Sequence, residues 1–220
     1  MKKSHLLCVL YLKNIRMRND YFRYYHPKLL IPLLVFLGVI FYLGNSYFDS
    51  HWGVSLSITA VITSLLILID KYLWKYKPFC YLFWSINLQG RYEGVIEYCD
   101  PITGSVVEKM TTIEISQTGS SIKIQSFFGE GNNGEKSMSR SLDTSLIRDD
   151  HNEYSIVFTY LNGGNITMNF PPHYGTNIFR VLNSKDKVTG LRGEYYTNRC
   201  PIQTKGTIQV DYKTRVLNQG

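Results

Sequence analysis

The stretch LQGRYEGVIEY, from Leu88 to Tyr98, sets the fold of the larger part of this 220-residue chain. Leu88, Gly90 and Tyr92 begin a series of apolar or small residues at every second position, and most residues between them are charged or polar. A period of two places alternate side chains on opposite faces of a β-strand. The stretch therefore predicts a strand with one buried and one exposed face.

The same alternation recurs as far as the C-terminal part of the chain. It returns at 111–115, 122–128, 138–142, 154–160, 166–170, 191–198 and 205–213. The turn Asn162-Gly163-Gly164 joins two of these segments, and such residues are strong hairpin signals. In the segment 170–184, Pro171-Pro172 indicates the end of a strand, Tyr174-Gly175 begins a turn, and residues 177–182 fit either a strand or a short helical turn. These segments predict an all-β domain over 88–220, which we interpret as a minimal eight-stranded antiparallel β-barrel. A sandwich of two sheets is the alternative.

Closure into a barrel is favoured by a weak internal repeat. LQGRYEG at 88–94 and LRGEYYT at 191–197 both read L-x-G-x-Y, which places glycine and tyrosine on one face near both ends of the domain. Glycine in a strand permits tight bending or a close approach by another group. Closure removes exposed strand edges, and eight strands leave room for side chains or one small ligand. Coincidence between two common strand patterns is the simpler alternative.

Two apolar runs without charged residues precede this domain. They are LLIPLLVFLGVIFYLGNSYF at 29–48 and WGVSLSITAVITSLLILI at 52–69. Each is close to the ~20 residues that a helix needs to cross about 30 Å of hydrocarbon. We therefore expect a transmembrane region over 29–74, with helices at about 29–48 and 52–72 joined by the short turn Asp49-Ser50-His51. A buried helical hairpin in a soluble core is the alternative.

The charge distribution orients this predicted hairpin. Residues 1–77 contain ten Lys and Arg and three Asp, a net charge of +7, and residues 78–220 contain fourteen of each sign. The predicted turn carries no Lys or Arg, so the positive-inside rule places the basic segment 1–28, the linker 75–87 and the barrel in the cytoplasm. Anionic lipid explains the basic segment. The neutral barrel lacks the basic face that a DNA or RNA polymer requires.

The sequence contains no motif that indicates catalysis or metal binding. There is no P-loop, GxGxxG, nucleophile elbow or paired metal-ligand motif. The four cysteines form no close pair, and we expect ordinary surface roles for the dispersed histidines, including His173. We predict a protein that is not an enzyme and that has no cofactor and no metal site. An enzyme whose residues meet only in the fold is the alternative.

Aromatic and basic residues on the expected inner face suggest a ligand site instead. Aromatic rings stack on nucleotide bases, and arginine binds phosphate oxygens two at a time. The predicted ligand-binding residues are Tyr92, Tyr98, Arg140, Tyr160, Tyr195, Arg199 and Tyr212. Any one of these tyrosines is explained equally well as a core residue whose hydroxyl reaches solvent.

The order of these parts resembles one bacterial family. Two predicted N-terminal membrane helices, a short basic linker and a barrel opening near L-x-G-x-Y-x-G are similar to the membrane effectors with a β-barrel receptor in CBASS, the cyclic-oligonucleotide-based anti-phage signalling system. The resemblance implies a cytoplasmic receptor for a cyclic dinucleotide made by a cGAS/DncV-like nucleotidyltransferase. It also implies homo-oligomerisation on activation, disruption of the inner membrane and cell death. A membrane-tethered, lipocalin-like carrier of a hydrophobic ligand and a scaffolding protein remain alternatives.

Overall fold

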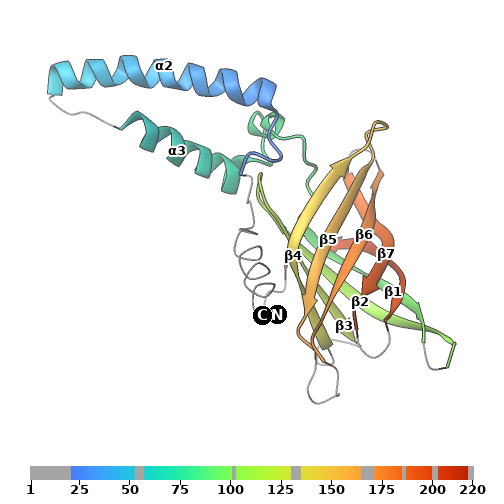
Figure 1. Ribbon diagram of the computed structural model, residues 1–220. Helices are drawn as coiled ribbons and strands as arrows, with labels where there is room; N and C mark the ends of the chain where they lie inside the picture. The colour runs from blue at the N-terminus through green and yellow to red at the C-terminus, as the bar shows by residue number, and fades with distance from the viewer. Residues whose placement is uncertain are drawn as a thin grey trace, which may run out of the picture.

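The chain forms a small helical unit and a β-barrel (Figure 1). In this computed structural model the described residues are 21–52, 57–100, 103–129, 135–164, 171–184, 187–199 and 203–217. The helical unit is drawn in blue and green, and the barrel runs from green to red (Figure 1). The two parts meet at one end of the barrel.

Eight antiparallel strands form a closed barrel, as the alternation predicted. They are β1 (Gly90–Cys99), β2 (Val106–Gln117), β3 (Ile122–Gly129), β4 (Glu135–Arg148), β5 (Tyr154–Asn162), β6 (His173–Ser184), β7 (Lys187–Thr197) and β8 (Lys205–Thr214). Each strand pairs with the next, and β8 pairs with β1 to close the barrel. Every second side chain points inward, so residues such as Tyr92, Ile113 and Leu191 are fully buried. The sandwich alternative is thereby excluded.

The structure resolves two uncertain strands. The segment that fitted either a strand or a helical turn is strand β6, which pairs with both β5 and β7. The strand predicted at 166–170 lies outside the described residues. In β4 the predicted inner face is wrong, because Ser139 is buried while Arg140 is exposed. A register shift between Ser141 and Asp143 then changes the alternation along the rest of that strand.

The internal repeat places its residues as expected, and the structure shows why glycine is needed. Tyr92 and Tyr195 are both buried inside the barrel. A Cβ at Gly193 would collide with the carbonyl oxygen of Ile178 on β6. At Gly94 it would collide with the carbonyl oxygen of Gln209 on β8. The groups that approach these glycines are therefore neighbouring strands and not a ligand.

The helical unit corrects the predicted hairpin of two spanning helices. Its elements are α2 (Pro27–Trp52), α3 (Ile58–Leu68), the π-helical turn η1 (Ile69–Leu73) and the 3₁₀ turn η2 (Phe79–Leu82). Among the described residues, only α2 is long and apolar enough to cross a membrane, over Pro27–Tyr47. The turn predicted at 49–51 is wrong, because these residues belong to α2.

The second predicted span is interrupted for local reasons. Helix α3 begins at Ile58, where the Ser57 hydroxyl accepts a hydrogen bond from the backbone N–H of Ala60 and caps the helix. Its 11 residues rise only about 16 Å. The helix then changes to π geometry at Ile69, where Ile69 and Asp70 are buried. Hydropathy detects the apolar run but not the cap or the change of helix type.

The helical unit has a compact apolar cluster of its own, beside the end of the barrel to which hydrogen bonds join it. We call it the docking cluster; it consists of Tyr25, Leu30, Leu66, Ile69, Trp74 and Phe83. Hydrogen bonds flank it: Arg23 donates to the Ser145 hydroxyl at 2.6 Å, and the backbone N–H of Gly119 donates to the Asp70 carbonyl at 2.9 Å. The residues before α2 and those after α3 therefore both contact the barrel.

Candidate functional site

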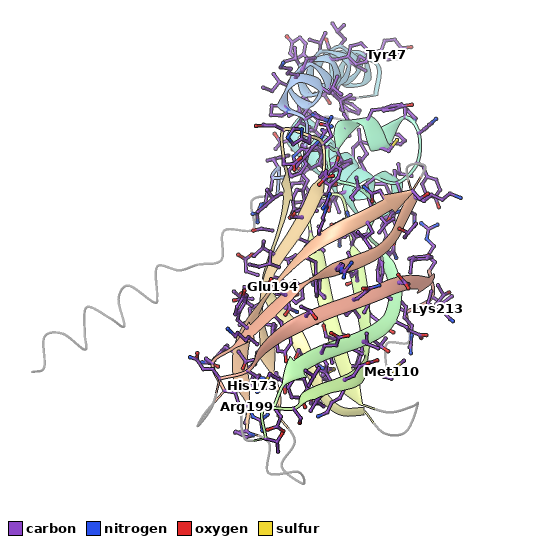
Figure 2. All side chains as sticks on the ribbon, turned by 90° about the vertical axis from the view of Figure 1, so that its right-hand side faces the viewer. Tyr47, Met110, His173, Glu194, Arg199 and Lys213 are labelled. Atoms are coloured by element: carbon purple, nitrogen blue, oxygen red, sulfur yellow. The ribbon has the colours of Figure 1, made fainter. Side chains whose placement is uncertain are left out.

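The barrel is hollow at both ends and filled in between. Along β5, β7 and β8, buried apolar residues such as Ile156, Leu191 and Val210 separate the residues that line one hollow from those that line the other. We call the two hollows the distal cavity and the helix-side cavity. Figure 2 places His173 and Arg199, which line the first, at the end of the barrel far from the helices. Lys213, beside the second, lies toward the helices (Figure 2).

The distal cavity receives side chains from every strand of the barrel. Its volume is about 480 Å³, within the range of roughly 300–1,000 Å³ that is typical of ligand sites. Its described lining comprises Ile96, Tyr98, Glu108, Lys109, Met110, Phe128, Gly129, Ser137, Tyr160, Asn162, His173, Asn177, Tyr195, Thr197, Arg199, Thr204 and Ile208. A closed ring of strands thus surrounds a pocket with an aromatic wall and polar groups.

Glycines opposite the tyrosines make room for the aromatic wall. Gly175 pairs with Tyr160 across β5 and β6, and a Cβ there would overlap the Tyr160 ring. Gly206 pairs with both Tyr98 and Tyr195, and a Cβ there would lie 2.8 Å from the Tyr195 ring. Glycine therefore stands opposite each of these tyrosines, and the tyrosine rings occupy the space that a side chain would fill.

The hydroxyls of Tyr160 and Tyr195 stay protonated at physiological pH. Burial, together with the neighbouring Tyr98, raises the pKa of Tyr195 to about 12. Burial also raises the pKa of Tyr160, with a further contribution from Tyr195. A protonated phenol offers a flat face for stacking and an O–H that donates a hydrogen bond.

Two basic side chains bring positive charge to the cavity. Arg199 follows the end of β7, and Lys109 projects from β2 with its ammonium group 5.4 Å from the centre of the Tyr98 ring. Glu108 is the acidic residue of the lining. Arginine and lysine are the side chains that bind phosphate groups most readily.

Buried polar groups complete the lining. The Asn162 amide donates to the Ser139 hydroxyl at 2.9 Å and accepts from the backbone N–H of Gly164 at 2.8 Å, so it holds the end of β5. The Asn177 side chain is buried, and its Oδ1 has no hydrogen-bond partner among the described residues. Burial and, more weakly, the charge of Arg199 lower the pKa of His173, which favours its neutral form.

Comparison with protein families identifies the barrel. The family model described as "Cap15, cyclic dinucleotide receptor domain" matches residues 85–212, more than half of the chain. The chain belongs to this family. The match begins just before β1 and ends within β8, so it covers the barrel and not the helices. A comparison with curated proteins finds no match.

Within this Cap15-type barrel, four of the seven predicted ligand-binding residues lie together. Tyr98, Tyr160, Tyr195 and Arg199 all line the distal cavity. The other three lie elsewhere. Tyr92 is buried and donates its hydroxyl to the Leu88 carbonyl at 2.8 Å, and with Tyr212 it lines the helix-side cavity. Arg140 is exposed on the outer face of β4 and lines neither cavity.

Sequence reasoning missed several residues of the Cap15-type pocket. Lys109 belongs to an exposed, polar-looking part of β2, and Asn177 and His173 lie in the segment whose structure the sequence left open. The surface role expected for His173 is wrong, since only 8 % of this residue is exposed. The pair Tyr174-Gly175 was the available signal, because glycine in a strand often marks a close approach.

Proposed function

We propose that the distal cavity is the site where this chain binds a cyclic dinucleotide, and that the chain is a receptor and not an enzyme. The match to the cyclic dinucleotide receptor family, together with a cavity that combines tyrosines and cations, carries this proposal. Four of its aromatic and basic lining groups are the ones that the sequence indicated. We propose no cofactor and no metal.

Each part of such a ligand has a chemical counterpart in the lining. The rings of Tyr98, Tyr160 and Tyr195 offer faces on which the bases stack. Arg199 and Lys109 offer one cation for each of the two phosphodiester groups. Hydroxyls of Ser137, Thr197 and Thr204 supply donors and acceptors for the sugars.

This lining also separates the proposal from its two alternatives. A carrier of a hydrophobic ligand has no use for Arg199, Lys109 and Glu108 around one cavity. A scaffold needs no cavity at all. A DNA or RNA polymer does not fit, because the hollow is enclosed by strands on all sides and the barrel has no excess of positive charge.

The helical unit is proposed to anchor the receptor in the bacterial inner membrane. In this proposal α2 crosses the bilayer, and the chain returns to the same side through the segment that contains α3, which lies beside α2 (Figure 1). The docking cluster supports this topology, because Tyr25 before α2 and Ile69 after α3 pack together next to the barrel. Both flanking segments are basic, which agrees with a cytoplasmic side for the N-terminus and the barrel.

We propose a CBASS-type anti-phage response as the output of this receptor. A cGAS/DncV-like nucleotidyltransferase supplies the cyclic dinucleotide, and binding favours an assembled form of the receptor. A ligand shifts such an equilibrium only by its differential affinity for the two forms. Homo-oligomers then bring the membrane helices together, disrupt the inner membrane and kill the infected cell.

Calorimetric titration of the full chain in detergent micelles tests the binding step. The titrants are cyclic dinucleotides, cyclic trinucleotides and linear dinucleotides. Loss of a charge-assisted contact in Arg199→Gln should weaken binding about 10- to 150-fold. Arg192→Gln is the matched control, because Arg192 is exposed on β7 and lines neither cavity. Absence of heat with every cyclic dinucleotide would remove the receptor function.

A further inference from the structure

The helix-side cavity has a chemistry that cyclic dinucleotide binding at the other end does not use. Its volume is about 770 Å³. Its described lining comprises Ile86, Asn87, Gln89, Tyr92, Arg148, Asn152, Tyr154, Asn183, Lys187, Val188, Tyr212 and Arg215. These residues come from the linker before β1, from β1 itself, from the turn between β4 and β5, and from the helix-side ends of β4 to β8.

The lining of this cavity is positively charged. Arg148, Lys187 and Arg215 belong to it, and no acidic residue is among its described members. Arg148 lies over the Tyr154 ring at 5.7 Å, an interaction that leaves its charge intact. The described ion pair nearest in sequence to Arg148 joins Glu153 to Arg180, neither of which lines the cavity.

Neutral polar side chains accompany the three cations. Asn87, Gln89, Asn152 and Asn183 line the same hollow. The Asn87 side chain accepts a hydrogen bond from the backbone N–H of Gln89, which orders the linker at the rim. Amide groups donate and accept hydrogen bonds, so they suit the phosphate and hydroxyl oxygens of one small anion.

The cavity lies beside the base of the membrane helix. Its rim includes the linker that follows η2, and the Tyr154 hydroxyl donates to the Trp84 carbonyl in that linker at 3.1 Å. The Trp84 indole donates to the Arg23 carbonyl at 3.2 Å and packs edge-on against Tyr24. Helix α2 begins three residues after Tyr24. A short, ordered path thus joins the cavity to the start of the spanning helix.

We propose that the helix-side cavity binds the phosphate-bearing headgroup of an anionic glycerophospholipid from the inner leaflet. This inference rests on the membrane location in the proposed function. Three cations without a lining carboxylate select an anion, and the neighbouring helix places the cavity within reach of lipid headgroups. The barrel then binds a soluble messenger at one end and a lipid headgroup of the membrane surface at the other.

Native mass spectrometry of the full chain, released from neutral detergent micelles, tests this site. The micelles contain phosphatidylglycerol or phosphatidylcholine, and inorganic phosphate is added in a third series. We expect phosphatidylglycerol to remain bound and phosphatidylcholine to be lost. The triple variant Arg148→Gln, Lys187→Gln and Arg215→Gln should weaken retention of phosphatidylglycerol about 100-fold.

Matched variants distinguish loss of the lipid site from a general loss of positive charge and from unfolding. Lys123→Gln, Arg192→Gln and Lys205→Gln remove the same charge from exposed strand positions outside both cavities and should leave lipid retention unchanged. The exchanges Arg148→Lys, Lys187→Arg and Arg215→Lys keep the charge and should keep most of the retention. Cyclic dinucleotide binding is measured on every variant, so failure of the receptor function is seen separately.

Three results would overturn the lipid assignment. Equal retention of phosphatidylglycerol by the triple variant and its control would show that the three cations do not form the site. Equal retention of the two lipids would show that the headgroup charge is not recognised. Tighter binding of inorganic phosphate than of phosphatidylglycerol would assign the cavity to a soluble anion.

Discussion

Gly175→Ala probes the way in which the aromatic wall is built. Gly175 lies opposite Tyr160 in the β5–β6 pair. The new methyl group would overlap the Tyr160 ring and lie 2.6 Å from the carbonyl oxygen of Tyr196. The ring therefore has to swing out of its place, and the strands have to separate slightly.

The size of the effect follows from these contacts. Inserting a methyl group into a filled space costs about 1–3 kcal/mol, which for a barrel of this size lowers the melting temperature by roughly 3–15 °C. A displaced Tyr160 also loses its stacking contact with a base, worth about 1–3 kcal/mol, or about 5- to 150-fold in affinity. Thermal melting and calorimetric titration of the full chain measure the two losses.

Gly163→Ala is the matched control for this variant. It makes the same chemical change just beyond the end of β5, where the nearest atom, the Met138 carbonyl oxygen, is 4.0 Å away. In a Tyr160→Ala background, Gly175→Ala should cost less stability than it does when the ring is present, because only the contact with Tyr196 remains. If Gly175→Ala melts and binds like Gly163→Ala, our account of the wall is wrong.

Three further variants test other parts of the account. Burial and Arg199 lower the pKa of His173 in the folded chain, so below pH 6.5 the unfolded chain binds the proton more readily. The melting temperature should therefore fall as the pH drops from 6.5 through the folded-state pKa. His173→Asn should make this fall shallower, and the exposed control His151→Asn should leave it unchanged. In cells with a cyclic dinucleotide synthase, the full chain should depolarise the inner membrane and a chain without residues 1–77 should not; a truncated chain that still kills would refute the membrane mechanism. The chain from residue 81 onward should give a circular dichroism spectrum dominated by β-structure, and a helical spectrum would contradict its independent folding.

The barrel was predictable because its inner and outer faces differ in polarity along most strands. Tyr92, Ile113 and Ile208 are buried at the positions where a period of two puts them. The same rule failed in β4, where inward-facing Ser137 lines the cavity and inward-facing Ser139 is buried, while Met138 and Leu142 lie on the other face. Polar groups line this cavity from inside the barrel, so the polarity pattern of the strand reverses there.

The composition of the site was predictable only in part. Tyr98, Tyr160, Tyr195 and Arg199, which line one cavity, were predicted to lie together because they occur at alternating positions near the ends of strands. A single sequence does not tell which end of a strand meets which cavity, so the prediction grouped them with Tyr92 and Tyr212, which line the helix-side cavity. Pairing and register decide this, and both depend on contacts between distant segments.

The helical unit shows a second limit of sequence patterns. Hydropathy identified two apolar runs, but it carries no information on where a helix is capped or where its geometry changes. Ser57 caps α3 just before Ile58, and the π-helical turn that begins at Ile69 brings Asp70 into contact with the barrel. The cap and the change of helix type limit α3 to 11 residues, fewer than a membrane span needs.

The central claim is that a cyclic dinucleotide occupies the distal cavity, and hydrogen–deuterium exchange of the full chain in detergent micelles tests it most directly. A saturating cyclic dinucleotide should slow exchange at the distal ends of the strands, in segments 107–111, 160–162, 173–177 and 195–197. The segments 144–148 and 187–190 at the helix-side mouth should change little. Protection confined to the helix-side mouth, or no protection with any cyclic dinucleotide, would contradict the account.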